Sequence, residues 1–308
     1  MTPPVLLNVA RPWGEADPVA LAARALEAGL DGVGLADSPR LFPDPLVETA
    51  RVLAGTDARL AGPCVLGLGL RHPATVAGAV RTLAAHHPGR VVAVVGRGES
   101  SVRNEGLPVP SLPEHEAAMR ALRELLVDGP TLLGAASGPR TIAATAVALG
   151  GVLVDVGTDP AVLARAVGLA HGAAVWVFLR AAVTSCVEEA DAAARPVLGS
   201  CAARIAGAPD WYGVGGDELA HVRAVAAAHD YRRHGTAAAG HATGPGDALV
   251  RERFLVTGDG PTITARVREL AAVGVDGVVL AGAVAGVTER LAELATAVTA
   301  GLSTDPRE

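Results

Sequence analysis

Several polar residues directly follow short apolar runs, and their types suit anion binding. Residues 134–140 read Gly-Ala-Ala-Ser-Gly-Pro-Arg, which places small residues and a hydroxyl before a proline that can begin a helix. The free amides at such a helix start attract phosphate, because they carry the positive end of the helix dipole. The alternative is an ordinary capped turn. The residues predicted at this phosphate site, including a second set of amides after the next apolar run, are Ala135, Ala136, Ser137, Gly138, Val156, Gly157 and Thr158.

A second group of such residues reads Gly96-Arg97-Gly98-Glu99. The two glycines allow a flat ring to lie against the backbone. Glu99 is predicted to donate a proton or to anchor a ring hydroxyl, the alternative being a solvated loop carboxylate. Arg97 and Arg180, each at a predicted strand end, suit the binding of an acidic substrate group, although a surface ion pair is the alternative for both.

Asp37 ends another apolar run, and Asn8 lies in the first one. We take Asp37 as a candidate catalytic residue, with a turn cap as the alternative role. Asn8 is a candidate substrate contact.

These residues need a fold that gathers strand ends, and the alternation of apolar and helical segments predicts one. The expected strands are 5–9, 32–35, 60–68, 91–95, 131–135, 151–156, 174–179 and 277–281. The expected helices are 18–28, 45–54, 73–86, 114–127, 140–149, 160–170, a long stretch over 184–234, and 262–273. Eight strands separated by helices predict an α/β (β/α)8 TIM barrel, in which chemistry takes place where strands run into helices.

The same phrase, Gly-(Leu or Val)-Asp-Gly-Val, occurs at 29–33 and at 274–278, each time after an Ala-rich helical stretch. A barrel makes these two segments structural equivalents. Residues 207–216 and 234–247 are rich in Gly, Ala and Pro, which predicts an insertion and a mobile loop between the seventh and eighth strands. We expect one domain over 1–302 and a flexible tail over 303–308.

The charge and the cysteine content of this 308-residue chain exclude several kinds of partner and site. Its net charge is −6 and it has no long run of Lys or Arg, so nucleic acid is not an expected partner. The three cysteines and nine histidines show no metal-ligand spacing, which predicts neither a disulfide nor a metal site and fits a cytoplasmic protein. We expect no signal peptide and no membrane span.

Sequence blocks along nearly the whole chain resemble the luciferase-like monooxygenase superfamily, in its order and at its spacing. The blocks are 27–37, 56–62, Arg71-His72-Pro73, Pro88-Gly89-Arg90, Gly96-Arg97-Gly98, Thr257-Gly258 and 274–278. Residues 135–139 and 98–99 most resemble the branch that uses the deazaflavin coenzyme F420, which includes F420-dependent glucose-6-phosphate dehydrogenase and methylenetetrahydromethanopterin reductase.

The resemblance implies a cofactor ring across the barrel mouth, with its phosphate at the fifth and sixth strand ends. It also implies a cis peptide bond at about Cys64-Val65, which adds both residues to the cofactor-binding candidates with Gly96 and Gly98. A homodimer through helices near the second and third strands is implied as well. In many relatives the residue after the strand-two aspartate is a histidine that takes the substrate proton. Here it is Ser38, a candidate catalytic residue whose hydroxyl is a poor base.

We therefore expect an F420-dependent reductase or dehydrogenase that transfers a hydride between the deazaflavin and a small or medium organic substrate. An apolar pocket for that substrate is suggested by Leu41, Phe42, Leu66 and Leu68. One alternative is a monooxygenase using reduced FMN and dioxygen, since FMN carries a phosphate on the same kind of arm. Another is a barrel that binds a flavin-like ligand without turning it over.

Overall fold

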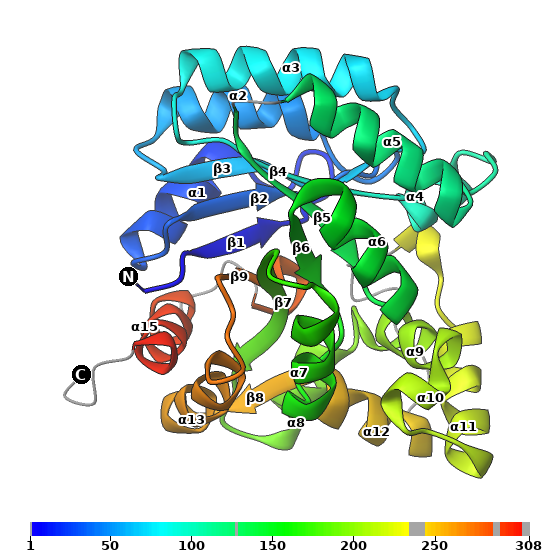
Figure 1. Ribbon diagram of the computed structural model, residues 1–308. Helices are drawn as coiled ribbons and strands as arrows, with labels where there is room; N and C mark the ends of the chain where they lie inside the picture. Colours follow the sequence, from blue (N-terminus) through cyan, green and yellow to red (C-terminus); the bar gives the residue numbers. More distant parts are fainter. Residues whose placement is uncertain (1, 127–128, 234–243, 286–289, 304–308) are drawn as a thin grey trace.

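Eight parallel strands close into a barrel in the computed structural model, which describes residues 2–126, 129–233, 244–285 and 290–303 (Figure 1). The barrel strands are β1 (Val5–Val9), β2 (Gly32–Leu35), β3 (Leu60–Gly67), β4 (Val92–Gly96), β5 (Thr131–Ala136), β6 (Gly151–Val154), β7 (Ala174–Val183) and β9 (Gly277–Leu280). Each strand from β1 to β7 pairs with the next one, and β9 closes the barrel between β7 and β1. The predicted TIM barrel is confirmed.

Helices connect the strands on the outside of the barrel, and a proline in the first turn begins most of them. The main outer helices are α1 (Pro18–Glu27), α2 (Pro45–Gly55), α3 (Pro73–His86), α5 (Leu112–Leu125), α6 (Pro139–Leu149), α7 (Pro160–Leu169), α13 (Gly260–Ala271) and α15 (Leu291–Leu302). Proline is favourable there because the amide it lacks has no partner within the helix. An aspartate caps the N-terminus of α1, α2, α7 and α13. None of the described helices is long and apolar enough to cross a membrane.

The repeated phrase of the sequence has the same structural role at both places. Gly29 and Gly274 follow helices α1 and α13 with φ values of +87° and +95°, a conformation that glycine adopts without a steric penalty. The carboxylate of Asp31 then accepts from the Val5 amide at 2.8 Å, and that of Asp276 accepts from the Val175 amide at 2.8 Å. Each aspartate thus ties its helix-to-strand turn to the start of a neighbouring strand.

The insertion between β7 and β9 differs from its prediction. The stretch over 184–234 is not one helical segment, because Pro209 and the positive φ of Gly213 and Gly216 divide it. Its elements are α8 (Val187–Ala194), α9 (Leu198–Gly207), α10 (Pro209–Tyr212), α11 (Gly216–Ala227) and η1 (Tyr231–Arg233). Most of the expected mobile loop over 234–247 lies outside the described residues, and the last residues of this loop begin α12 (Pro245–Phe254). Residues 304–308 of the expected tail also lie outside the described residues.

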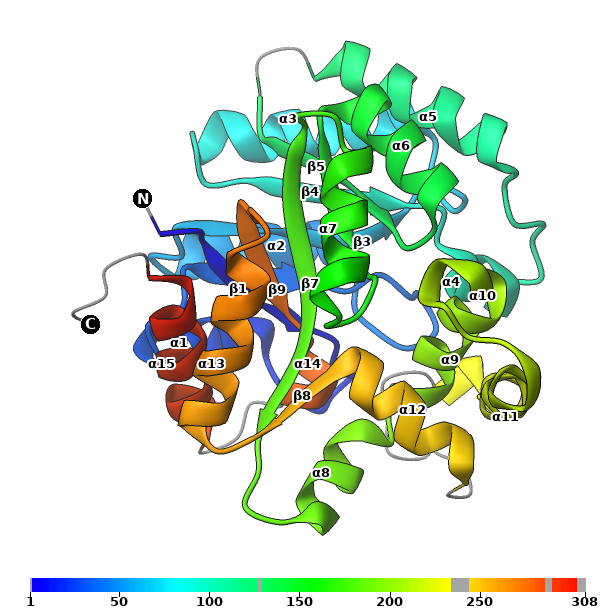
Figure 2. The same ribbon diagram turned by 60° about the horizontal axis from the view of Figure 1, so that its bottom comes forward.

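A short strand that the sequence did not predict follows α12. This strand, β8 (Leu255–Gly258), pairs in parallel with Arg180–Val183, the part of β7 that extends beyond the barrel (Figure 2). Two short helices, α4 (Glu99–Asn104) after β4 and α14 (Gly282–Ala285) after β9, complete the described elements.

The inside of the barrel is filled by apolar side chains at the level where the strands begin. Trp176 is 4% exposed, and its ring occupies the space that a Cβ at Gly277 would need, only 2.4 Å away. The cluster around it consists of Leu6, Leu60, Cys64, Val92, Val94, Leu133, Leu153, Trp176 and Val279. The described side chains therefore fill the barrel at this level, and a cavity lies toward the C-terminal ends of its strands.

Candidate active site

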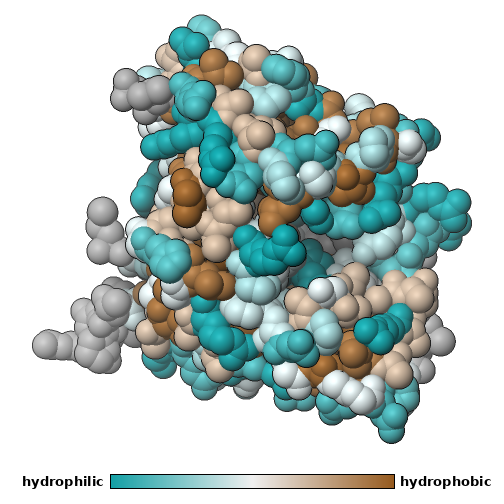
Figure 3. Space-filling model, turned by 45° about the vertical axis from the view of Figure 1, so that its right-hand side comes forward, coloured by the Kyte–Doolittle hydropathy of each residue, from teal (hydrophilic) through white to brown (hydrophobic). Residues whose placement is uncertain are grey.

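A cavity of about 330 Å³ lies at the C-terminal ends of the strands, where the molecular surface is hollowed (Figure 3). This volume suits a small organic ligand. The predicted site residues that line it are Asn8, Asp37, Ser38, Cys64, Val65, Gly96, Arg97, Gly98, Glu99, Ala135, Ala136, Ser137 and Arg180. Gly138 does not line the cavity, although its neighbour in the chain, Ser137, does. The remaining predicted residues, Val156, Gly157 and Thr158, do not line the cavity.

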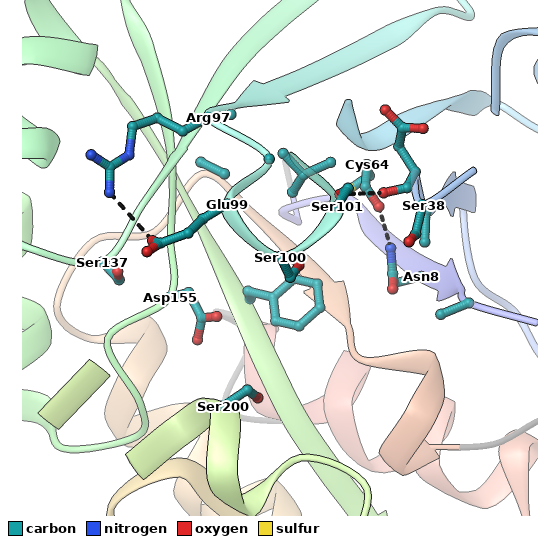
Figure 4. A pocket seen from close by; sticks show the side chains of 18 of the residues that line it. Asn8, Ser38, Cys64, Arg97, Glu99, Ser100, Ser101, Ser137, Asp155 and Ser200 are labelled. Atoms are coloured by element: carbon teal, nitrogen blue, oxygen red, sulfur yellow. Dashed lines mark hydrogen bonds and ion pairs between the residues drawn. The ribbon is translucent and has the colours of Figure 1, made fainter. Parts of the chain in front are cut away.

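Glu99 points into the cavity from the first turn of α4 (Figure 4). Gly98, which precedes it, has a φ of +69°, and its Cα packs against Gly67 so closely that no side chain fits between them. The carboxylate of Glu99 is half exposed and accepts from Arg97 at 3.3 Å and from Arg103 at 2.9 Å. Glu99 is therefore a carboxylate held at the cavity by two guanidinium groups, and not an unpaired loop residue.

Asp37 connects three loops around the cavity. Its Oδ2 accepts from the Gly67 amide at 2.9 Å and from Arg71 at 2.5 Å, while its backbone oxygen accepts from the Ser101 hydroxyl at 3.1 Å. Oδ1 is buried and has no hydrogen-bond partner among the described residues. Burial raises the pKa of Asp37, outweighing the effects of the Gly67 amide and the Arg71 charge. The contacts make Asp37 a positioning residue for the loops after β2, β3 and β4.

The floor of the cavity between β1 and β3 is held by Asn8. Its side-chain amide donates to the Cys64 backbone oxygen at 2.6 Å, and the Cys64–Val65 peptide bond is cis, as the resemblance implied. Burial raises the pKa of the Cys64 thiol to about 12, so this cysteine is not a thiolate nucleophile at neutral pH. Ser38 is 7% exposed, and its backbone oxygen accepts from the amides of Leu41 and Phe42 at 2.8 Å each.

The start of α6 offers the backbone amides that the phosphate prediction requires. Its N-cap residue is Gly138, so no side chain accepts from these amides, in contrast to the aspartate caps of α1 and α7. A Cβ at Gly138 would have nothing within 4 Å, which shows open space in front of the helix end. Ser137 and Thr141 line the cavity on either side of it. These residues fit a phosphate group.

The second half of the predicted phosphate site is occupied by protein. The Thr158 amide donates to the Arg253 backbone oxygen at 2.8 Å, and a Cβ at Gly157 would lie 2.2 Å from that oxygen. These two residues therefore pack against the end of α12, and Val156 is buried. Asp155, immediately after β6, lines the cavity instead.

Asp155 binds two arginines from different elements. Arg180 of β7 donates to both of its oxygens, at 2.5 and 2.8 Å, and Arg204 of α9 donates to Oδ2. Burial alone would raise the pKa of Asp155, but the charges of Arg180 and Arg204 outweigh it and hold the pKa below its ordinary value. Arg180, predicted as a substrate contact, is thus 3% exposed and ion-paired, and it lines the cavity together with Asp155 and Arg204.

Sequence reasoning missed Asp155, Arg204 and Thr141. Asp155 interrupts an apolar run, Val152-Leu153-Val154-Asp155-Val156, in the way that a residue at a strand end does. Because Val156 continues the run, the predicted strand extended two residues too far. Arg204 lies in the insertion, and no pattern in the sequence places that helix over the barrel mouth.

The buried side chain of His115 in α5 should make the stability of the protein depend on pH. It is 1% exposed, and neither ring nitrogen has a hydrogen-bond partner among the described residues. Burial, assisted by the charge of Arg97, lowers its pKa from 6.5 to about 4. The unfolded chain therefore takes up this proton first as the pH falls, so stability is lost between pH 6.5 and about 4.

Urea unfolding at several pH values tests this expectation. Over that window His115 should cost at most about 3 kcal/mol of unfolding free energy, and His115→Leu should lose less stability than the wild type. His86→Leu, at an exposed position, is the control and should behave as the wild type does. Parallel pH curves for the wild type and His115→Leu would contradict the assignment.

The structure is that of a TIM-barrel protein with a cavity at the C-terminal ends of its strands, and comparison with known proteins indicates its family. Residues 10–127 match the family described as luciferase-like monooxygenase. The predicted resemblance is thus confirmed for this part of the chain. The search of curated protein sequences found no match.

Solved structures match over nearly the whole chain, at low sequence identity. The coenzyme F420-dependent tetrahydromethanopterin reductase from Methanopyrus kandleri is 17% identical with a TM-score of 0.70, over 96% of this chain and 97% of that one. An F420-dependent secondary alcohol dehydrogenase, in complex with an F420–acetone adduct, is 15% identical with a TM-score of 0.71, over 99% and 100%. The EDTA monooxygenase from Chelativorans sp. BNC1 is 14% identical with a TM-score of 0.60, over 100% and 96%. At these identities the likeness shows the shared fold.

Proposed function

We propose that the protein is an F420-dependent oxidoreductase of the luciferase-like group, which transfers a hydride between the deazaflavin and a small or medium organic substrate. The observation that carries this proposal is the uncapped start of α6 beside a cavity that Glu99 enters. The combination supplies a phosphate site, space for a ring and a carboxylate at one place. The F420-dependent enzymes among the similar structures support the choice of cofactor.

The residues that would hold the cofactor come from three strand ends. Ser137 and the amides after Gly138 would bind its phosphate, and Cys64, Val65, Gly96 and Ala135 would lie against its ring. When bound, the deazaflavin supplies or accepts the hydride. The chain itself orients the substrate in the cavity and excludes water from it, which is where a protein contributes most to such a reaction.

Glu99 is the group we assign to proton handling. It reaches the cavity, and its exposed fraction of 51% leaves it accessible to a bound substrate. Arg97 and Arg103 fix the positions of its two oxygens. Asp37 positions the surrounding loops, and the Ser38 hydroxyl lines the cavity without a base to activate it among the contacts described.

An FMN-dependent monooxygenase is the second candidate. The family match and the monooxygenase among the similar structures favour it, and the phosphate site does not distinguish FMN from F420. In both cases we propose a cytoplasmic enzyme that forms a homodimer, as the resemblance implies.

Fluorescence titration of the purified protein with F420 and with FMN tests the proposal. We expect F420 to bind at least about tenfold more tightly, a difference of about 1.4 kcal/mol. Tighter binding of FMN would reverse the order of the two candidates. Binding of neither would contradict both, whereas binding without hydride transfer to any compound in a panel of alcohols, ketones and imines would leave a non-catalytic binding barrel.

A further inference from the structure

Three charged side chains meet at the cavity where β6, β7 and α9 come together. The carboxylate of Asp155 accepts from both η nitrogens of Arg180, and Arg204 adds a third donor to it. Arg204 also donates to the Ser200 backbone oxygen at 2.5 Å. Figure 4 shows Asp155 and Ser200 on the same side of the cavity, away from Asn8 and Ser38.

The charges in this Asp155–Arg180–Arg204 cluster do not balance. Two guanidinium groups share one carboxylate, which leaves one positive charge. The other acidic side chains that line the cavity have cationic partners of their own, because Glu99 pairs with Arg97 and Arg103, and Asp37 pairs with Arg71. The Arg180 side chain is 3% exposed and that of Arg204 is 26% exposed, so the spare charge is poorly solvated and an approaching anion would stabilise it.

The hydrogen bonds of the cluster are incomplete as well. The Nε atoms of Arg180 and Arg204 are buried, and neither has a partner among the described residues. Arg180 is only 3% exposed. Its guanidinium carbon lies 5.0 Å from the ring centroid of Phe178 and 5.8 Å from that of Phe254. Buried donors without partners add to the cost of the uncompensated charge, and an anion beside the guanidinium groups would reduce that cost.

Apolar side chains border the cluster inside the cavity. Phe178, over whose ring Arg180 lies, and Val197 line the same cavity as Arg180 and Arg204. An inorganic ion alone would leave these surfaces in contact with water, whereas an organic molecule with one charged end would cover them.

We propose that the cavity takes an organic substrate that carries an oxyanion, a carboxylate or a phosphate, and that Arg204 together with Arg180 binds this group. Asp155 holds the two guanidinium groups side by side and leaves one of their charges for the ligand. The identification of the ligand as the substrate rests on the proposed function, whereas the anion site itself does not. The phosphate of the cofactor belongs to the separate site at Ser137.

Calorimetric titration of the cofactor-free protein with benzoate and with benzamide tests the proposal. The two probes have the same shape and differ in charge. Benzoate should bind at least about tenfold more tightly, because hydrogen bonds to charged groups contribute more than neutral ones. The preference should disappear in Arg204→Met, which removes the spare charge and leaves Asp155 paired with Arg180. Arg223→Met, at an exposed position of α11, is the matched control and should keep the preference.

The same variants distinguish a substrate oxyanion from the cofactor phosphate. Arg204→Met should bind F420 and FMN within about threefold of the wild type, a change below 1 kcal/mol. Equal affinities for benzoate and benzamide in the wild type, or a preference that survives in Arg204→Met, would overturn the proposal. So would a parallel loss of cofactor and benzoate affinity, which would assign the cluster to the cofactor. If neither cofactor binds but benzoate is preferred, the proposed function fails and the anion site remains.

Discussion

Gly138→Asp is expected to lower the affinity for the phosphate-bearing cofactor about a hundredfold, close to 2.7 kcal/mol. Gly138 has φ −113° and ψ 153°, a backbone conformation open to any residue, and free space where a side chain would begin. An aspartate there would cap α6 as Asp159 caps α7, so its carboxylate would take the amides that we assign to phosphate. Its charge would also repel the phosphate.

Two further variants at the same position separate these effects. Gly138→Asn caps the helix without the charge and should lose less cofactor affinity, while Gly138→Ala provides no cap and should bind nearly as the wild type does. The melting temperature of Gly138→Asp should be equal to or above that of the wild type, because an aspartate is the better cap. Unchanged cofactor affinity in Gly138→Asp would place the phosphate elsewhere. Fluorescence titration and thermal unfolding measure both quantities.

The barrel could be predicted from the sequence because its signals are local. Strands β1 and β2 have the predicted bounds, and the other barrel strands begin within one residue of theirs, since each is a buried apolar run before a polar residue or a helix start. The exceptions lie where tertiary contacts decide. β7 continues past the barrel to pair with β8, whose four residues directly follow α12 and carry no pattern of their own.

The candidate site could be predicted only in part, because tertiary contacts also decide which residues reach the cavity. Strand ends β1 to β5 supplied most of the cavity-lining residues, because a barrel brings those ends together whatever the loops do. The end of β6 was predicted incorrectly, since α12 packs on Gly157 and Thr158 and thereby leaves Asp155 facing the cavity. That contact joins residues about 95 positions apart, and no local pattern of the chain encodes it.

Glu99→Gln is expected to lower turnover by about 10²- to 10⁴-fold, the usual contribution of a positioned proton-transfer group. The substitution keeps the size of the side chain, replaces one of its two acceptor oxygens with an NH2 donor and removes the carboxylate that would give or take a proton. Cofactor affinity should change by less than tenfold, because no contact that we assign to the phosphate or the ring involves this carboxylate. Turnover is followed by the deazaflavin absorbance with whichever compound of the panel is converted.

Glu105→Gln provides the matched control for this prediction. Glu105 follows α4 directly, pairs with Arg40 at 3.0 Å and does not line the cavity. It therefore undergoes the same chemical change six residues, or about 1.7 helical turns, further along the chain. Full turnover in Glu105→Gln with a large loss in Glu99→Gln would assign the proton to the cavity carboxylate. Equal turnover in both variants would remove Glu99 from the mechanism and leave its ion pairs with Arg97 and Arg103 as a structural link at the mouth of the barrel.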